Sequence, residues 1–66
     1  MSATQYQRNQ ILRLMRKLEL DTRRITLMHR RIGVSDQWLD KPVDAWMNTL
    51  SVEESSNLIV KLEAMQ

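Results

Sequence analysis

The chain has few of the residues that interrupt helices and none that cross-link small folds. Its 66 residues include no cysteine, one glycine and one proline. The absence of cysteine excludes a disulfide framework and a thiolate metal site, and it favours a reducing, cytoplasmic setting. A single glycine also excludes a glycine-rich phosphate loop.

Long apolar runs are missing as well. No run approaches the roughly 18–20 apolar residues that span a bilayer, and residues 1–8 have no apolar stretch of signal-peptide type. The length allows one core, with about 3–5 kcal/mol of stability available from it. We therefore expect one domain over residues 1–66, with no membrane association.

The spacing of apolar residues predicts an all-α fold, a compact single-domain bundle of four to five short helices with a helix-turn-helix-like corner. Large apolar residues recur three and four positions apart, which is typical of helices with one buried face. We expect helices at roughly 5–20, 22–32, 36–40, 42–49 and 52–65. The expected inner faces are Ile11, Leu14, Met15 and Leu18; Ile25, Met28 and Ile32; Trp38 and Leu39; Val43, Trp46, Met47 and Leu50; and Leu58, Ile59, Leu62 and Met65.

Capping residues predict where the first and last helices begin. Thr4 with Gln7, and Ser51 with Glu54, have the spacing of capping boxes, in which each side chain bonds the other residue's backbone N–H. These two pairs place helix starts near residues 5 and 52.

Further signals divide the middle of the chain. We expect Asp21 to cap the second helix, Gly33 to end it in a left-handed conformation, and Ser35 to cap a short third helix. Pro42 suits the first turn of a fourth helix, where its missing N–H costs nothing.

The charges are unevenly divided, although the net charge is only +2. Residues 1–35 carry eight basic side chains against two acidic ones, whereas residues 36–66 carry two basic against six acidic. A positive half can attract phosphates or an acidic protein surface. Alternatively, the division reflects ordinary solvated helix faces, or it draws two copies into a homodimer.

No motif indicates catalysis or a bound cofactor. His29 lacks the second histidine or glutamate of a zinc helix, so we interpret it as a structural residue. Asp36 and Asp40 are four residues apart, but they have no acid or metal-ligand partner. We expect a non-enzymatic protein without metal or cofactor.

Residues 25–42 resemble a helix-turn-helix around Gly33. Against a groove reader, His29 occupies a position usually filled by alanine, and Pro42 interrupts the recognition helix. Asp36, Gln37 and Asp40 would form the reading face, and two of the three are anionic beside phosphates. We interpret the segment as a tight corner between packed helices.

Two stretches of the chain resemble known phage proteins. The helix Gln10-Ile-Leu-Arg-Leu-Met-Arg-Lys-Leu-Glu-Leu-Asp21, followed by an arginine-rich segment, resembles small helical modules of phages and prophages. Leu50-Ser-Val-Glu-Glu-Ser-Ser-Asn-Leu-Ile-Val-Lys-Leu62 is similar to the tail Leu-Thr-x-x-Glu-Ala-Ser-x-Leu-Ile-x-x-Leu of phage recombination and DNA-metabolism proteins. The overall order resembles the Mu-like phage regulatory family GemA. The resemblance implies a host-modulating or DNA-metabolism role without catalysis.

Our leading hypothesis is a small helical adaptor or inhibitor, encoded by a phage or mobile element, that binds a protein of DNA metabolism or host defence. Three apolar residues, Leu12, Leu27 and Val60, lie off the inner faces, either as scattered surface residues or as part of a contact surface. The alternative is a small dimeric DNA-binding transcriptional regulator with a degenerate helix-turn-helix. The expected partner-binding or nucleic-acid-binding residues are Arg13, Arg16, Lys17, Arg23, Arg24, Arg30, Arg31, Leu12 and Leu27.

Overall fold

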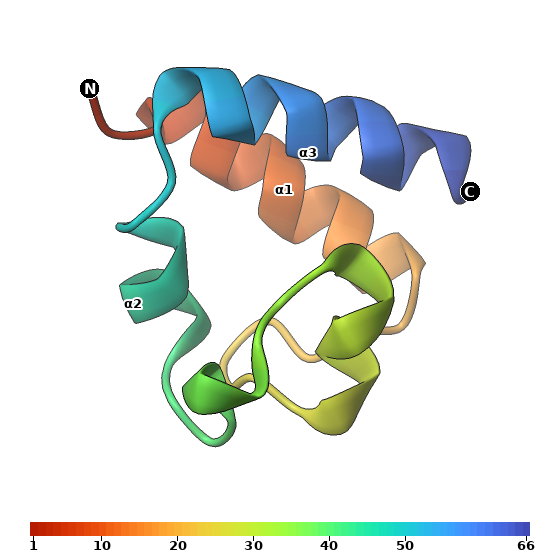
Figure 1. The fold of residues 1–66 in the computed structure, drawn as a ribbon. Helices are drawn as coiled ribbons and strands as arrows, with labels where there is room; N and C mark the ends of the chain where they lie inside the picture. The colour runs from red at the N-terminus through yellow and green to blue at the C-terminus, as the bar shows by residue number, and fades with distance from the viewer.

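The two longest helices lie side by side and begin at the same end of the molecule. A computed structural model describes residues 1–66, in which α1 spans Gln5–Lys17 and α3 spans Val52–Ala64. Figure 1 shows both helices running in the same direction across one side of the fold. The residues before them form an isolated antiparallel bridge between Ser2 and Ser51, which holds the two starting points together.

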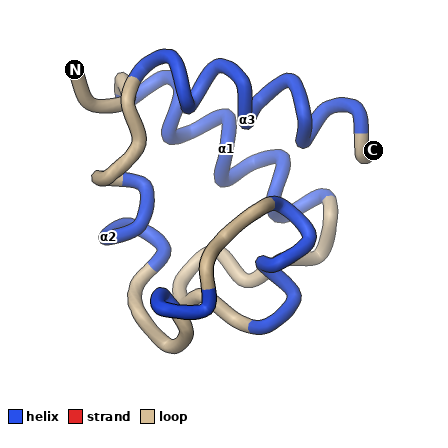
Figure 2. Tube along the Cα trace, viewed as in Figure 1, coloured by secondary structure: helices blue, strands red, loops and turns tan.

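The chain between these helices forms a second layer of short elements. They are η1 (Leu27–Ile32), η2 (Asp36–Trp38) and α2 (Val43–Met47), of which η1 and η2 are 3₁₀ helices. In Figure 1, α2 lies near the beginning of the long helices, and η1 lies toward their ends. Figure 2 shows that loops join all of these elements and that no strand is present. The predicted all-α class is confirmed.

The core lies between the two layers. Its buried residues come from every element except η2 and from the segments that connect the elements. Twelve apolar residues are buried there: Ile11, Leu14, Met15, Leu20, Ile25, Ile32, Val34, Val43, Trp46, Met47, Leu58 and Leu62. Most of the residues that we predicted from apolar spacing are among them, and Leu18, Trp38, Leu50, Ile59 and Met65 pack against them while partly exposed. The prediction is wrong at Leu39, which is 37% exposed. None of the helices has the length and hydrophobicity that crossing a bilayer requires.

Both predicted capping boxes are present. At Thr4 and at Ser51, each hydroxyl accepts the N–H of the residue three positions on, whose side chain accepts the cap's own N–H. The side-chain amide of Gln7 has a further role, because it donates to the backbone oxygen of Val52 at 3.0 Å and to the hydroxyl of Ser56 at 3.2 Å. The α1 capping box is therefore also a polar link to α3.

The first helix ends earlier than predicted, at Lys17 rather than near residue 20. Glu19 adopts a left-handed conformation with φ 62°, and the N–H of Leu20 bonds the oxygen of Met15 at 2.9 Å. This is the Schellman arrangement, in which a glycine usually takes the left-handed position. Since a glutamate stands there instead, the sequence carried no signal for the end of the helix. Leu20 is buried as a result of the turn.

The prediction of one helix over residues 22–32 is wrong in its first half. Residues 23–25 are extended and pair with residues 40–43 through an isolated bridge between Arg24 and Pro42. Ile25 donates its N–H to the oxygen of Lys41 at 2.9 Å and accepts the N–H of Asp40 at 2.9 Å. The backbone groups of this segment are thus satisfied by distant residues, and no local helix is needed.

The second half of that segment is a 3₁₀ helix, which changes the face that is buried. A 3₁₀ helix has three residues per turn, so residues three apart lie above one another. His29 and Ile32 share the buried face, whereas Met28, which we predicted to be buried, is 55% exposed. The predicted inner stripe assumed 3.6 residues per turn and is wrong at Met28.

The remaining boundaries differ from the predictions by a few residues. Gly33 ends η1 with φ 89°, and the hydroxyl of Ser35 caps η2, both as predicted. The third helix stops at Trp38 rather than residue 40, because Leu39 and Asp40 turn away, the latter with φ 64°. The fourth spans Val43–Met47 instead of residues 42–49, and Pro42 is its cap rather than its first residue.

Ser55 is a buried polar residue with no partner in the protein. It lies on α3 with no exposed surface, and its hydroxyl makes no hydrogen bond. A buried hydroxyl that loses its water without gaining a partner costs about 1–3 kcal/mol. Ser55 therefore lowers the stability of the fold.

We predict that Ser55→Ala raises the free energy of unfolding by about 1–2 kcal/mol, since alanine removes the unpaired group and favours helix. Urea denaturation of the two proteins measures the difference. Ser56→Ala is the matched control, because Ser56 is exposed and its hydroxyl accepts a bond from Gln7; it should not stabilise. A less stable Ser55→Ala protein would contradict the prediction.

Candidate binding surfaces

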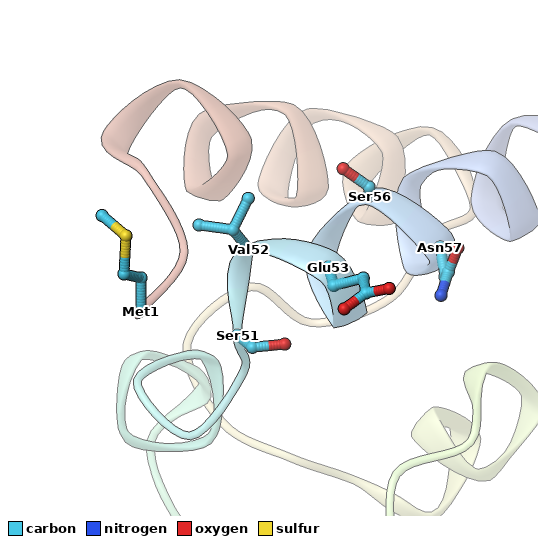
Figure 3. A pocket seen from close by; sticks show the side chains of 6 residues that line it. All are labelled: Met1, Ser51, Val52, Glu53, Ser56 and Asn57. Atoms are coloured by element: carbon cyan, nitrogen blue, oxygen red, sulfur yellow. The ribbon is translucent and has the colours of Figure 1, made fainter.

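Two shallow clefts are present, one at the start of α3 and one beside η2. The larger, about 510 Å³, lies at the start of α3 and is lined by Met1, Ser51, Val52, Glu53, Ser56 and Asn57 (Figure 3). Its hydroxyls are already engaged, since Ser51 caps α3 and Ser56 accepts from Gln7. The smaller, about 280 Å³, is lined by Gln37, Trp38 and Lys41. No histidine lines either cleft, and no group of three histidine, cysteine, aspartate or glutamate side chains gathers anywhere in the fold.

His29 has a structural position, as its sequence context indicated. The side chain is fully buried, and its Nε2–H donates to the backbone oxygen of Asp21 at 2.8 Å. Because a carbonyl oxygen can only accept, this contact fixes the proton on Nε2 and leaves Nδ1 as an acceptor. Nδ1 accepts the N–H of Thr26 at 2.9 Å, which completes a capping box for η1. Both ring nitrogens therefore bond backbone groups of the segment between α1 and η1.

Asp21 caps a turn instead of a helix. Its carboxylate accepts the backbone N–H of Arg23 at 2.7 Å and that of Arg24 at 3.1 Å. These two bonds stabilise the charged form and hold the pKa of Asp21 below its ordinary value. The cap turns the chain after α1 into the extended pairing with residues 40–43.

The predicted basic residues lie on three separate segments. All seven are exposed: Arg13, Arg16 and Lys17 on α1, Arg23 and Arg24 on the segment that connects α1 to η1, and Arg30 and Arg31 on η1. No hydrogen bond or ion pair joins the basic side chains of α1 to those of η1. We therefore treat the basic residues as two groups, one on α1 and one on and around η1, and not as the single surface that we expected.

Two of the seven basic residues already have partners. The guanidinium of Arg24 donates to the backbone oxygen of Asp40 at 2.6 Å. Arg30 forms a two-pronged ion pair with Asp36, in which its Nε donates at 2.8 Å. This pairing lowers the pKa of Asp36 and raises that of Arg30. Arg30 thus stabilises the corner around Gly33, and the carboxylate of Asp36 balances its positive charge.

The other five have no acidic partner. Arg16, Lys17, Arg23 and Arg31 make no side-chain hydrogen bond or ion pair, and Arg13 bonds only the neutral side chain of Gln10. Their charges are available to a ligand.

The two apolar residues that we predicted to bind a partner, Leu12 and Leu27, differ in their exposure. Leu12 is partly buried and packs against the core, so its location off the inner stripe has a structural explanation. Leu27 is 55% exposed, as is its neighbour Met28. Sequence reasoning missed Met28, because its spacing matched an α-helical stripe and nothing in the sequence announced a 3₁₀ helix. Leu27 and Met28 form an exposed apolar pair beside arginines on η1.

The corner at Gly33 lacks the second helix that a groove reader needs. The element after the turn, η2, has three residues. A recognition helix lies along a major groove with several residues at base edges, and one 3₁₀ turn is too short for that. The corner instead positions Val34, which is buried, and the Arg30–Asp36 pair.

Comparisons with protein-family models, with curated proteins and with solved structures found no match to this chain. The resemblance to phage modules and to the GemA family therefore stays a prediction.

We predict that His29→Ala lowers the free energy of unfolding by about 2–4 kcal/mol, because it leaves a cavity and removes the partner of two part-buried backbone groups. Thermal denaturation followed by circular dichroism measures the loss. Arg31→Ala, an exposed change on the same element, should stay within about 0.5 kcal/mol of the unchanged protein. Equal stability of the His29→Ala protein would contradict the structural role.

A second prediction concerns the stability of the folded protein at acidic pH. Asp21 and Asp36 have lowered pKa values in the folded state, so their stabilising contribution is present above the unfolded pKa of about 4. It is lost as pH falls through the lower folded values. We expect Asp21→Asn/Asp36→Asn to be less stable than the unchanged protein at pH 7 and to lose less stability between pH 7 and pH 3. Urea denaturation at both pH values tests this, and an unchanged loss in the double variant would refute it.

Proposed function

We propose that this chain is a non-enzymatic helical adaptor or inhibitor that binds another protein through a surface on and around η1. Because the resemblance points to phage modules, the proposed partner is a protein of DNA metabolism or host defence. The observation that carries the proposal is the exposure of two apolar side chains, Leu27 and Met28, on the same 3₁₀ helix as Arg31, which has no ion-pair partner.

The geometry of η1 explains why these side chains occur together. Since residues three apart lie above one another in a 3₁₀ helix, Leu27 and Arg30 share one side of η1, and Met28 and Arg31 share another. His29 and Ile32 occupy the third, buried face. The exposed two-thirds of the helix therefore presents two apolar–basic pairs to solvent. We call Leu27, Met28, Arg31 and Arg23, which precedes η1 in the chain, the η1 surface.

This combination suits a protein partner better than a nucleic acid. Burying a leucine or methionine side chain contributes about 1.5–3 kcal/mol, which an apolar pocket on a protein can supply. Methionine adapts to irregular surfaces, and arginine is enriched at interfaces. The unpaired charges of Arg23 and Arg31 favour acidic groups around such a pocket. A partner with an apolar pocket rimmed by carboxylates fits the η1 surface.

The alternative, a dimeric DNA-binding regulator that reads bases with the segment after Gly33, has less support. The three-residue η2 offers little to insert into a groove, and Asp36 would face phosphates while already paired with Arg30. Dimerisation through the opposite charges of the two chain halves remains part of that alternative.

We predict that Leu27→Ser/Met28→Ser weakens partner binding at least about tenfold, because it removes the proposed apolar anchor. The tagged protein is used to recover partners from nuclease-treated and untreated extract. The dissociation constant of the recovered, purified partner is then measured for each variant. Arg23→Glu/Arg31→Glu should weaken binding by a comparable factor and more strongly at low salt.

Val60→Ser is the matched control, since Val60 is also an exposed apolar residue, 65% exposed, but belongs to another element, α3. It should leave the affinity within about twofold. Recovery of the partner only in the absence of nuclease would contradict direct protein binding. Equal losses for Val60→Ser and Leu27→Ser/Met28→Ser would show that the η1 surface is not the contact.

A further inference from the structure

The outward side of α1 is a second basic surface with a different chemistry. We call Asn9, Arg13, Arg16 and Lys17 the α1 face, and all four are exposed. The helix spans 13 residues, about 20 Å in length, and contains no aspartate or glutamate. Its inner residues, including Ile11 and Met15, are fully buried, and the four residues of the α1 face lie on the solvent side of the helix.

The four residues form a ridge with charged flanks. At 3.6 residues per turn, Arg13 lies between Arg16 and Lys17 around the helix axis, and Asn9, one turn earlier, lies about 40° from Arg13 on the side of Arg16. Arg16 lies about 60° to one side of Arg13, and Lys17 lies about 40° to the other. A polar ridge between two cations matches a groove with a phosphate backbone on each side.

Arg13 is held in place without losing its charge. Its Nε and Nη2 donate to the side-chain oxygen of Gln10 at 2.9 and 2.7 Å. The amide nitrogen of Gln10 in turn donates to the hydroxyl of Tyr6 at 2.9 Å. Because these partners are neutral, the guanidinium keeps its full charge and a free Nη1 edge. The network orients Arg13 in advance for an anionic ligand.

The α1 face differs from the η1 surface in having no exposed aliphatic side chain, since Leu12 packs against the core. Asparagine and arginine are side chains that bond base edges in the major groove, and lysine and arginine neutralise phosphates. Single strands are bound largely by stacking on aromatic rings, yet Tyr6 is the one aromatic residue on this helix. The one carboxylate paired with α1 is Asp44, which contacts Arg8 at 3.5 Å.

We propose that the α1 face binds double-stranded DNA, with Arg16 and Lys17 on the phosphates of either backbone and Arg13 over the groove between them. Binding is dominated by phosphate contacts and is therefore strongly dependent on salt. The site lies on the first helix, away from the helix-turn-helix-like corner. It does not depend on the η1 surface, and the chain can hold DNA and a protein partner at separate faces.

The test measures fluorescence anisotropy of a labelled 20-base-pair duplex of mixed sequence, titrated with the full chain at 25 to 200 mM salt. We expect Arg13→Gln/Arg16→Gln to weaken binding about tenfold or more at low salt. The slope of log affinity against log salt should fall by about 1, because Arg16 is the phosphate-neutralising charge that is lost, whereas Arg13 lies over the groove. Circular dichroism checks that the variant remains folded.

Arg23→Gln/Arg31→Gln is the matched control, because it removes two exposed, unpaired charges from the η1 surface. It should retain most of the affinity and most of the slope. Absence of duplex binding by the unchanged protein at 25 mM salt would overturn the proposal. So would equal losses in the two double variants, or tighter binding of a single strand or of a duplex RNA of the same sequence. Loss of partner protein rather than duplex by Arg13→Gln/Arg16→Gln would assign the α1 face to protein instead.

Discussion

Two parallel helices cannot be joined by a short turn, and this constraint shapes the rest of the molecule. Because α1 and α3 begin at the same end, the intervening chain must return the full length of α1 before α3 can start. Helices that run antiparallel need only a few linking residues. Here the return path contains η1, η2 and α2, and it forms the second layer of the core. The segment between α1 and α3 therefore makes up about half of the chain.

The connection is held by backbone and polar contacts that reach across the chain. Asp21 turns the chain, His29 ties η1 back to that turn, and residues 23–25 pair with residues 40–43. The extended pairing takes up backbone groups that would otherwise have formed a second long helix. As a consequence, the arginines of this region project from a loop and a 3₁₀ helix. Their separation from the α1 arginines creates two basic surfaces.

The two surfaces share a sign of charge but not a composition. The η1 surface combines arginine with exposed leucine and methionine, which suits an apolar pocket with an acidic rim. The α1 face combines arginine and lysine with asparagine and has no exposed aliphatic group, which suits a phosphate-lined groove. Charge alone, counted along the chain, could not separate them. An adaptor with a protein-binding face and a DNA-binding face is consistent with both.

The sequence by itself determined the helical class, the starts of α1 and α3, the turn at Gly33 and most of the core, because capping boxes and apolar spacing act over a few residues. It also identified His29 as structural and the arginines as exposed. Only the tertiary structure decided the end of α1 at Glu19, the extended segment before Thr26 and the exposure of Met28. These features depend on partners 15 or more residues away, or on a turn that glutamate rarely adopts. Local sequence patterns do not encode such long-range contacts, so the two surfaces could be defined only from the folded structure.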